Sequence, residues 1–327
     1  MVEWIVKPEE SGGRMDKYLK QRLKNAPDSF FYKMARKKNL VLNGKKCTAK
    51  EILNAGDKIN LYVSDDTIAL FSGNSGSEIN HISEYRNAFE KLKGITVIYE
   101  DSDLLFLYKP AGILSQKADS ETLSLNEWMI GYLLDKNIVS VDSLKVFHPS
   151  VLNRLDRNTS GIVIAGITPR GSRFGTKMIR ERAVRKFYHC ITEGICELNG
   201  CFEGYLIKNR ESNISSFYLT LEEIPEKNRK AADKVSLSAK PLENKCGHTL
   251  MEIELHTGKS HQIRSMLSTL GSPIAVDPKY GNSKNAFGQL LCAVRIEFPD
   301  RMEEEDFASY QSKIIECKAP FSLDDFR

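Results

Sequence analysis

The sequence lacks a long hydrophobic run. No stretch of about 18 apolar residues occurs in the 327-residue chain, and roughly that many are needed to cross the hydrocarbon core of a bilayer. The opening segment, MVEWIVKPEE, also lacks the basic start, the apolar stretch and the small-residue cleavage site of a secretory signal. We therefore expect a cytoplasmic protein that makes no contact with a membrane.

The sequence lacks the spacings of cysteine and histidine that are typical of metal sites. The seven cysteines are odd in number and scattered, without a Cys-x-x-Cys pair, which argues against a zinc ribbon and a disulfide framework. His256 and His261 do not have the i, i+4 spacing of a helical zinc site. Residues 258–260 resemble the end of a P-loop, but Ile253 stands where that loop needs glycine. We expect no metal and no cofactor.

An excess of charge of one sign is missing from the chain as a whole, since 47 Lys and Arg oppose 43 Asp and Glu, a net charge of +4. The distribution is uneven, however. Residues 1–63 hold 14 basic and 7 acidic side chains, whereas the rest of the chain holds 33 and 36. Clustered cations repel one another, and a phosphate backbone offsets that repulsion while releasing counterions. The first fifth of the chain therefore predicts a unit that binds a polyanion.

The pattern of apolar residues divides the chain into three segments. At 41% apolar residues and 327 residues in all, the chain suits one large and one small globular domain. In residues 1–63, helical spacing over 15–23 and 30–34 precedes an apolar run that ends at an Asn43-Gly44 turn signal, then an alternating strand after Gly56-Asp57. Residues 64–94 are rich in turn-forming residues and predict a linker with one helix, long enough to let the basic unit move.

Residues 95–327 show a mixed α/β pattern in which strands outnumber helices. Because strands and helices do not alternate regularly, an antiparallel-rich α+β sheet with flanking helices is favoured over a doubly wound parallel sheet. Strands are expected at 96–99, 104–108, 162–167, 186–192, 233–239, 249–256 and 290–298, and helices at 123–134, 169–182 and 260–270.

The segment LNRLDRNTSG, residues 152–161, stands out within this region. It places the carboxylate of Asp156 between the guanidinium groups of Arg154 and Arg157 and continues into a turn-forming trio. The apolar run that follows predicts a buried strand, which would hold the acid on a loop at the end of a rigid sheet, where catalytic residues are often found. The residues alone also allow a surface loop with a local ion pair.

The same segment resembles the RLD loop of the RluA-type pseudouridine synthases. Further blocks follow in the order that this family shows: YEDSDLLFLYKPAGI at 99–113, KFYHCITEG at 186–194, GKSHQIR at 258–264 and GSPIAVDPKYG at 271–281. The N-terminal unit, through Arg14, Asp16, Lys17, the NGK turn and the Gly-Asp step, resembles an S4 RNA-binding domain. The resemblance implies the pseudouridine synthase fold at 95–327, preceded by a small S4-like α/β domain at 1–63.

Members of this family convert uridine in RNA to pseudouridine without a cofactor. The bond from ribose C1′ to uracil N1 breaks, the base turns, and C1′ joins to C5. The resemblance implies that Asp156 performs this reaction as a single acid, whereas glycoside hydrolysis requires a pair of carboxylates. Asp156 either attacks the sugar or abstracts a proton from it, and the sequence leaves both roles open.

The resemblance also implies roles for three more residues near the acid. Arg264 would lie beside Asp156 and stabilise its charged form. Tyr188 would stack on the displaced uracil or exchange a proton with it, and Arg154 would fill the position that the flipped uridine vacates. In the S4-like unit, contacts with RNA are expected from Arg14, Lys17, Lys33, Arg36, Lys37, Lys38 and Lys45.

Three positions depart from the family pattern: Asn153 replaces a usual His, Val276 a usual Gly and Cys292 a usual His. None is a candidate site residue, so they bear on substrate choice and loop shape. The favoured function is isomerisation of uridines in structured RNA by a monomer, with large-subunit 23S ribosomal RNA favoured over transfer RNA. The alternatives are a non-catalytic RNA-binding or ribosome assembly factor, a tRNA-directed synthase and a glycosidase of free nucleosides.

Overall fold

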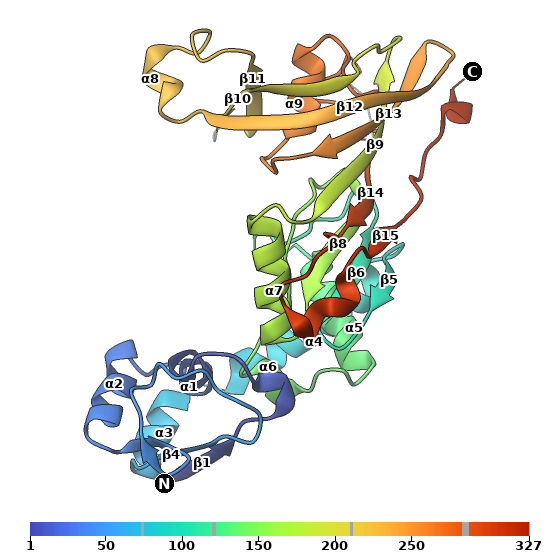
Figure 1. Cartoon of the computed structure of the whole chain (residues 1–327). Coiled ribbons are helices and arrows are strands. Elements are labelled where there is room, and N and C mark those ends of the chain that lie inside the picture. The colour runs from blue at the N-terminus through green and yellow to red at the C-terminus, as the bar shows by residue number, and fades with distance from the viewer. Residues whose placement is uncertain (73–74, 120–121, 210–211, 283–287, 327) are drawn as a thin grey trace.

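The computed structural model describes residues 1–72, 75–119, 122–209, 212–282 and 288–326. A small N-terminal unit lies at one end of an elongated molecule, and the rest of the chain is built around one large sheet (Figure 1). Among the described residues, no helix is both long and apolar enough to cross a membrane.

The N-terminal unit is a four-stranded antiparallel sheet in the order β1-β4-β2-β3 with two helices packed on it. Buried Ile59 and Leu61 share a core with Met15, Leu19 and Phe31 of the helices. Both predicted helices and the predicted strands are present, and the added strand β1 is a short edge strand. The elements are β1 (Val2–Ile5), α1 (Met15–Arg22), α2 (Asp28–Arg36), β2 (Leu40–Leu42), β3 (Lys45–Lys46) and β4 (Lys58–Leu61).

Within the described ranges, the large sheet has 11 strands, in the order β11-β10-β12-β13-β9-β14-β8-β6-β5, with β15 paired to β14 and β7 to β8. Every pairing between these described strands is antiparallel except that of β14 with β8. The predicted antiparallel-rich sheet is confirmed. Its strands are β5 (Thr96–Glu100), β6 (Leu104–Lys109), β7 (Ser150–Val151), β8 (Ser160–Gly166), β9 (Arg185–Glu193), β10 (Gly200–Asn209), β11 (Ile214–Tyr218), β12 (Asp233–Lys245), β13 (His248–Leu255), β14 (Leu291–Glu297) and β15 (Ile314–Glu316).

Helices cover both faces of this sheet where β6 and β8 cross it. Successive side chains of a strand point to opposite faces, so Leu105 and Leu107 of β6 pack with α5 (Leu125–Asp135), whereas Leu104 and Phe106 pack with α7 (Pro169–Arg180). The remaining helices are α3 (Asp65–Ser72), α4 (Ser75–Lys91), α6 (Val141–Leu144), α8 (Glu226–Arg229) and α9 (Gln262–Thr269), with 3₁₀ turns at Pro8–Glu10, Glu305–Tyr310 and Leu323–Asp325.

The segment expected to be a linker with one helix, residues 64–94, contains the two helices α3 and α4; positions 73 and 74 of that segment lie outside the described residues. Phe71 packs against the N-terminal core, and buried Tyr85 and Ala88 pack into the core of the large sheet. The physical reason is the helical spacing of Ile82, Tyr85, Phe89 and Leu92. Within its described side chains, this segment therefore makes apolar contacts with the cores on both sides of it.

Candidate active site

Asp156 lies on the loop between β7 and β8, as expected from the sequence. The hydroxyl of Ser115 donates to the carbonyl of Leu155 and accepts from its N–H, both at 3.0 Å, which secures the loop immediately before the acid. The N–H of Thr159 donates to the carbonyl of Asp156 at 3.0 Å and closes a turn after it. The side chain of Asp156 is 27% exposed, so hydrogen bonds hold the loop on both sides of the acid while the carboxylate stays accessible.

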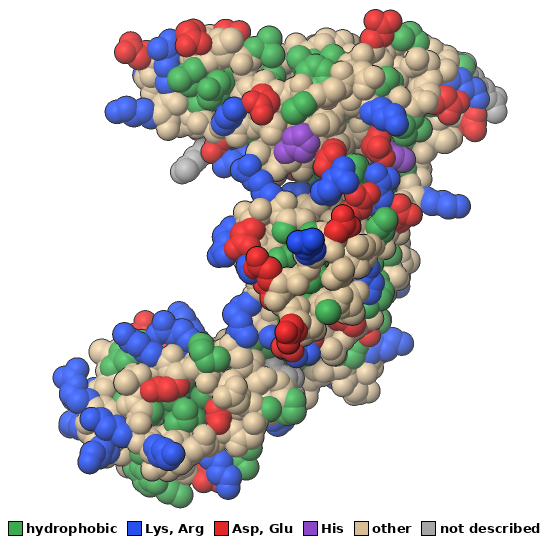
Figure 2. Space-filling model, in the orientation of Figure 1, with side chains coloured by type: hydrophobic (Ala, Val, Ile, Leu, Met, Phe, Trp, Pro, Cys, Tyr) green, Lys and Arg blue, Asp and Glu red, His purple; other side chains and the backbone are tan. Residues whose placement is uncertain are grey.

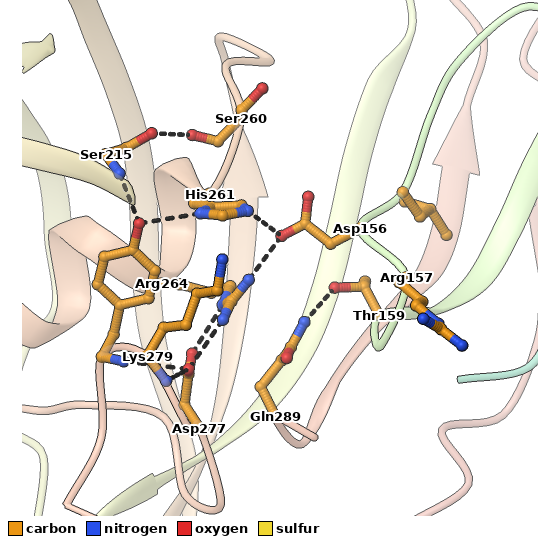
Figure 3. A network of polar contacts seen from close by, with 12 residues as sticks. Asp156, Arg157, Thr159, Ser215, Ser260, His261, Arg264, Asp277, Lys279 and Gln289 are labelled. Carbon is orange, nitrogen blue, oxygen red and sulfur yellow. Dashed lines mark hydrogen bonds and ion pairs between the residues drawn. The ribbon is translucent and has the colours of Figure 1, made fainter. Parts of the chain in front are cut away.

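Arg264 of α9 contacts this carboxylate, although 108 positions separate the two residues in the sequence. Its Nη1 donates to Oδ2 of Asp156 at 3.0 Å. Its Nε and Nη2 donate to the two oxygens of Asp277 at 2.7 and 2.8 Å (Figure 3). Asp277 is fully buried and also accepts from the N–H groups of Lys279 and Tyr280 at 2.9 and 3.1 Å. Arg264 is therefore fixed in orientation and turned toward Asp156.

Electrostatics keep the Arg264–Asp277 pair charged. Burial alone raises the pKa of Asp277, but the hydrogen bonds and charge of Arg264 outweigh it and leave the pKa below its usual value. Burial alone lowers the pKa of Arg264, and its hydrogen bonds to Asp277 with the charges of both carboxylates raise it overall. A permanent cation is thus present beside Asp156.

Tyr188 of β9 lies in the same core as Leu155, with only 7% of its surface exposed. It pairs with Ile253 of β13 on one side and Ala293 of β14 on the other. Its pKa is raised, first by burial and second by the negative charge of Asp156. The phenol therefore stays protonated and lies within electrostatic reach of the acid.

Lys109, at the end of β6, is a site residue that the sequence analysis did not single out. It is fully buried, and its Nζ donates to the carbonyls of Pro110, Ile113 and Arg157 at 3.0, 2.8 and 3.1 Å. Burial lowers its pKa to about 7, and the charge of Asp156 opposes that shift. The ammonium group ties the loop after β6 to the loop of Asp156. Its signal in the sequence was the Lys-Pro-Ala-Gly run within the first family block.

His261 adjoins the acid and Tyr280 adjoins His261, and neither residue was predicted. Nε2 of His261 lies 3.8 Å from Oδ2 of Asp156, and its Nδ1 lies 2.9 Å from the hydroxyl of Tyr280. Both residues stand in blocks that resemble the family, but nothing in those blocks indicates which side chains meet. In the described part of the chain, no three His, Cys, Asp or Glu side chains are grouped to hold a metal ion.

The other candidate residues are exposed. Arg154 lies two positions before Asp156, with its side chain toward solvent. The cations expected to bind RNA belong to the separate N-terminal unit, where basic side chains are frequent on the surface (Figure 2). They are not neighbours of Asp156, and all are exposed: Arg14, Lys17, Lys33, Arg36, Lys37, Lys38 and Lys45.

The three departures from the family pattern contact the scaffold. The amide oxygen of Asn153 accepts from the N–H of Ile164 at 2.7 Å. Val276 has a backbone φ of +63°, a conformation natural to glycine, so the loop before Asp277 keeps a shape that glycine would adopt. Cys292 is buried in β14, where it pairs with His189. None of these side chains contacts Asp156.

The sequence profile of RNA pseudouridylate synthase matches residues 103–269, just over half of the chain. That range includes Asp156, Tyr188 and Arg264. The chain therefore belongs to the RNA pseudouridylate synthase family, and it is an isomerase that converts uridine in RNA to pseudouridine.

Individual relatives match far beyond this range. An uncharacterised RNA pseudouridine synthase of Mycoplasma capricolum is 28% identical, covering 96% of this chain and 97% of its own. Ribosomal large subunit pseudouridine synthase D of Neisseria meningitidis is 25% identical and covers 86% of this chain and 67% of its own. Synthase C of Vibrio cholerae is 24% identical, covering 84% and 78%.

Solved structures show the same fold. Human RNA pseudouridylate synthase domain containing 4 is similar with a TM-score of 0.54 at 16% identity, covering 74% of this chain and 93% of that one. Human RNA pseudouridylate synthase domain containing 1 is similar with a TM-score of 0.51 at 18% identity, covering 71% and 93%. The large sheet with its flanking helices is thus the pseudouridine synthase fold.

Proposed function

We propose that Asp156 is the catalytic residue and that it acts on a uridine flipped out of structured RNA. The observation that carries this proposal is the 3.0 Å contact between its Oδ2 and Nη1 of Arg264. The fixed guanidinium holds the carboxylate in place, and the partial exposure of Asp156 leaves it accessible to a ligand. The charged carboxylate is the form required either to attack C1′ or to remove a proton from the ribose.

Tyr188 and Arg154 complete the proposed site. A phenol that stays protonated offers a hydrogen bond or a proton to the detached uracil, and its ring face offers a surface for stacking. Arg154 is exposed on the same loop as Asp156. Its planar guanidinium suits the position that a flipped base leaves in the RNA stack.

Large-subunit ribosomal RNA is the proposed substrate. The relatives from Neisseria and Vibrio are named as ribosomal large subunit synthases. Residues 1–63 are proposed as an S4-like RNA-binding domain, joined through residues 64–94 to a catalytic domain at 95–327. The seven exposed cations of this unit would contact phosphates, which supply affinity independent of sequence.

Release of tritium from RNA labelled at uracil C5 tests this proposal, because joining C1′ to C5 displaces that hydrogen. The wild-type protein should release tritium from a large-subunit ribosomal RNA transcript. Asp156→Asn should bind the transcript and release none. Asp300→Asn, a change at an exposed aspartate that bonds only Ser312 among the described residues, should behave as the wild type.

Each other outcome has a distinct meaning. Release by Asp156→Asn would remove Asp156 from the mechanism. Release from transfer RNA transcripts alone would overturn the choice of substrate. Binding of RNA by the wild type without release from either kind of transcript would favour a non-catalytic RNA-binding factor.

A further inference from the structure

His261 lies against Asp156 but has no part in the proposal above. It directly precedes α9, with a left-handed backbone φ of +57°, and only 9% of its side chain is exposed. One nitrogen of its ring faces Asp156 (Figure 3). The other lies 2.9 Å from the hydroxyl of Tyr280. A non-glycine residue holds such a backbone only where the surrounding structure enforces it. Here the conformation aims the imidazole at the acid.

The hydroxyl of Tyr280 determines which nitrogen of His261 carries the hydrogen. Its oxygen accepts from the backbone N–H of Ser215 at 2.7 Å, which leaves its own hydrogen to donate. Among the described residues, Nδ1 of His261, at 2.9 Å, is the acceptor placed to receive that hydrogen. Nδ1 therefore accepts, and the neutral ring carries its hydrogen on Nε2, the nitrogen that faces Asp156.

The surroundings favour this neutral ring. Burial lowers the pKa of His261, and the negative charge of Asp156 opposes that shift. The positive charges of Arg264, Lys279 and Lys208 lower the pKa further. The net shift is downward, so the imidazole is uncharged near neutral pH and remains able to accept from Tyr280.

The two oxygens of Asp156 have different environments. Oδ2 lies 3.0 Å from Nη1 of Arg264 and 3.8 Å from Nε2 of His261. Oδ1 has no hydrogen-bond partner within the described ranges. At 3.8 Å the imidazole N–H is too far for a hydrogen bond, and a shift of about 1 Å would form one. The guanidinium thus holds Oδ2, the imidazole N–H faces the same oxygen, and Oδ1 is left for a ligand.

We infer that His261 is a positioning residue: held in its Nε2–H form by Tyr280, it restrains Oδ2 of Asp156 and so presents Oδ1 to the ribose. This inference rests on the proposed catalytic role of Asp156. No covalent change occurs at the imidazole, which contributes only a directed N–H group.

The tautomer is measured by ¹⁵N NMR of the histidine rings in the full-length protein without RNA. The signals of His261, identified by their loss in His261→Gln, should show a bare Nδ1 and a protonated Nε2 at neutral pH. Tyr280→Phe removes the donor and should give a mixture of tautomers. A wild-type ring with its hydrogen on Nδ1 would overturn the inference, whatever the enzyme's activity.

Two substitutions separate the directed N–H from the backbone requirement. The amide nitrogen of Gln reaches the place of Nε2, whereas that of Asn reaches only the place of Nδ1. Asn adopts a left-handed backbone more readily than Gln does, so a purely structural role favours His261→Asn. We expect the reverse: His261→Gln keeps most of kcat, and His261→Asn loses roughly tenfold with KM unchanged. Equal kcat values in the two variants would contradict the inference.

Tyr280→Phe gives a further readout, the pH profile. Loss of a donor to Nδ1 removes an interaction that stabilises the neutral ring. The pKa of His261 should therefore rise, and the acid limb of kcat should move to higher pH. Tyr132→Phe is the matched control, because it removes the 2.8 Å hydrogen bond that the hydroxyl of Tyr132 on α5 donates to Glu100. It should keep the wild-type kcat and profile, and the same profile in Tyr280→Phe would count against this role of Tyr280.

Failure of the proposed function looks different from failure of this inference. In the first case Asp156→Asn releases tritium or the wild type does not. In the second case the wild type is active and depends on Asp156, but the His261 and Tyr280 variants lack the expected tautomer, kcat ratio or pH shift.

Discussion

Arg264 and Asp277 form a buried two-point ion pair that leaves one guanidinium nitrogen for Asp156. The two bonds measure 2.7 and 2.8 Å, and the side chains are 5% and 0% exposed. A planar group held at two points cannot turn its third nitrogen away. The geometry at Asp156 therefore depends on a second carboxylate that is fully buried.

We expect Asp277→Asn to destabilise the protein by roughly 3–5 kcal/mol, because removing one partner leaves the buried charge of Arg264 without full compensation. Urea unfolding of wild type and variant measures the difference. The exposed control Asp300→Asn should stay within about 0.5 kcal/mol of wild type. A loss below about 1 kcal/mol in Asp277→Asn would argue against this residue as the anchor of Arg264.

Low pH should remove the contribution of Asp277 to the free energy of unfolding. The pKa of Asp277 is lowered in the folded state, where Arg264 outweighs burial. A carboxyl of this kind contributes stability that is present above its unfolded pKa, near 3.9, and is lost as the pH falls through its lower folded pKa. The difference in unfolding free energy between wild type and Asp277→Asn should be level near neutral pH and shrink below about pH 4. A difference that shrinks well above that range would contradict the assignment.

Lys109 should change the free energy of unfolding at alkaline pH. Its folded pKa of about 7 lies below the usual 10.5 because of burial. Between these pH values Lys109 is protonated in more of the unfolded chains than of the folded ones. Its contribution to the free energy of unfolding therefore grows as the pH rises and is lost as the pH falls toward about 7. Relative to Lys109→Met, the wild type should gain unfolding free energy between about pH 7 and pH 10. Unfolding both proteins with guanidinium chloride at several pH values in this range tests the prediction. Parallel curves of unfolding free energy against pH would refute it.

Two substitutions of Tyr188 should separate the effect of its ring on the reaction rate from the effect of its hydroxyl. Tyr188→Phe keeps the ring and should lower kcat by roughly tenfold through loss of the hydrogen bond to the uracil. Tyr188→Leu should lose in addition the stacking surface, worth roughly 1–3 kcal/mol per base. Single-turnover tritium release measures both effects. Identical rates in the Phe and Leu variants would exclude stacking as a function of the ring.

Neutralising the N-terminal cations should weaken binding without blocking chemistry. Changing Lys33, Arg36, Lys37 and Lys38 to Gln should lower RNA affinity and reduce the slope of log K against log salt by roughly 0.7–0.9 for each phosphate that the variant no longer neutralises. Filter binding across a salt series measures the slope. Changing the exposed Lys93 and Lys136 should leave it nearly unaltered. An unchanged slope in the first variant would place the RNA elsewhere.

Local elements were predictable because their signals are local. The helix expected at 123–134 lies at Leu125–Asp135, and the helix expected at 169–182 lies at Pro169–Arg180. The strand order could not be predicted from the sequence, because β14 lies between β8 and β9 and pairs with segments far from it in the chain. The short edge strands β1 and β15 were missed, since three or four residues carry too little alternation. The longer strands β10 and β11 were missed as well.

The candidate site shows the same division. Family resemblance brought Asp156, Tyr188 and Arg264 to attention, and the structure places them close together. The residues that orient them, Asp277 and His261, stood in recognised blocks without an indication of their partners. A sequence motif specifies residue types, whereas a hydrogen-bond partner depends on how α9 and the turn after it pack in three dimensions.

The position of β14 also governs when the site can assemble. β14 lies between β9 and β8, although the ribosome makes it after both of them. Tyr188 belongs to β9 and Asp156 to the loop that leads into β8. Until β14 has emerged, these strands lack their shared neighbour, and the tyrosine and the acid have no common frame. A nascent chain therefore completes the strands of its N-terminal unit long before it can bring Tyr188 and Asp156 together.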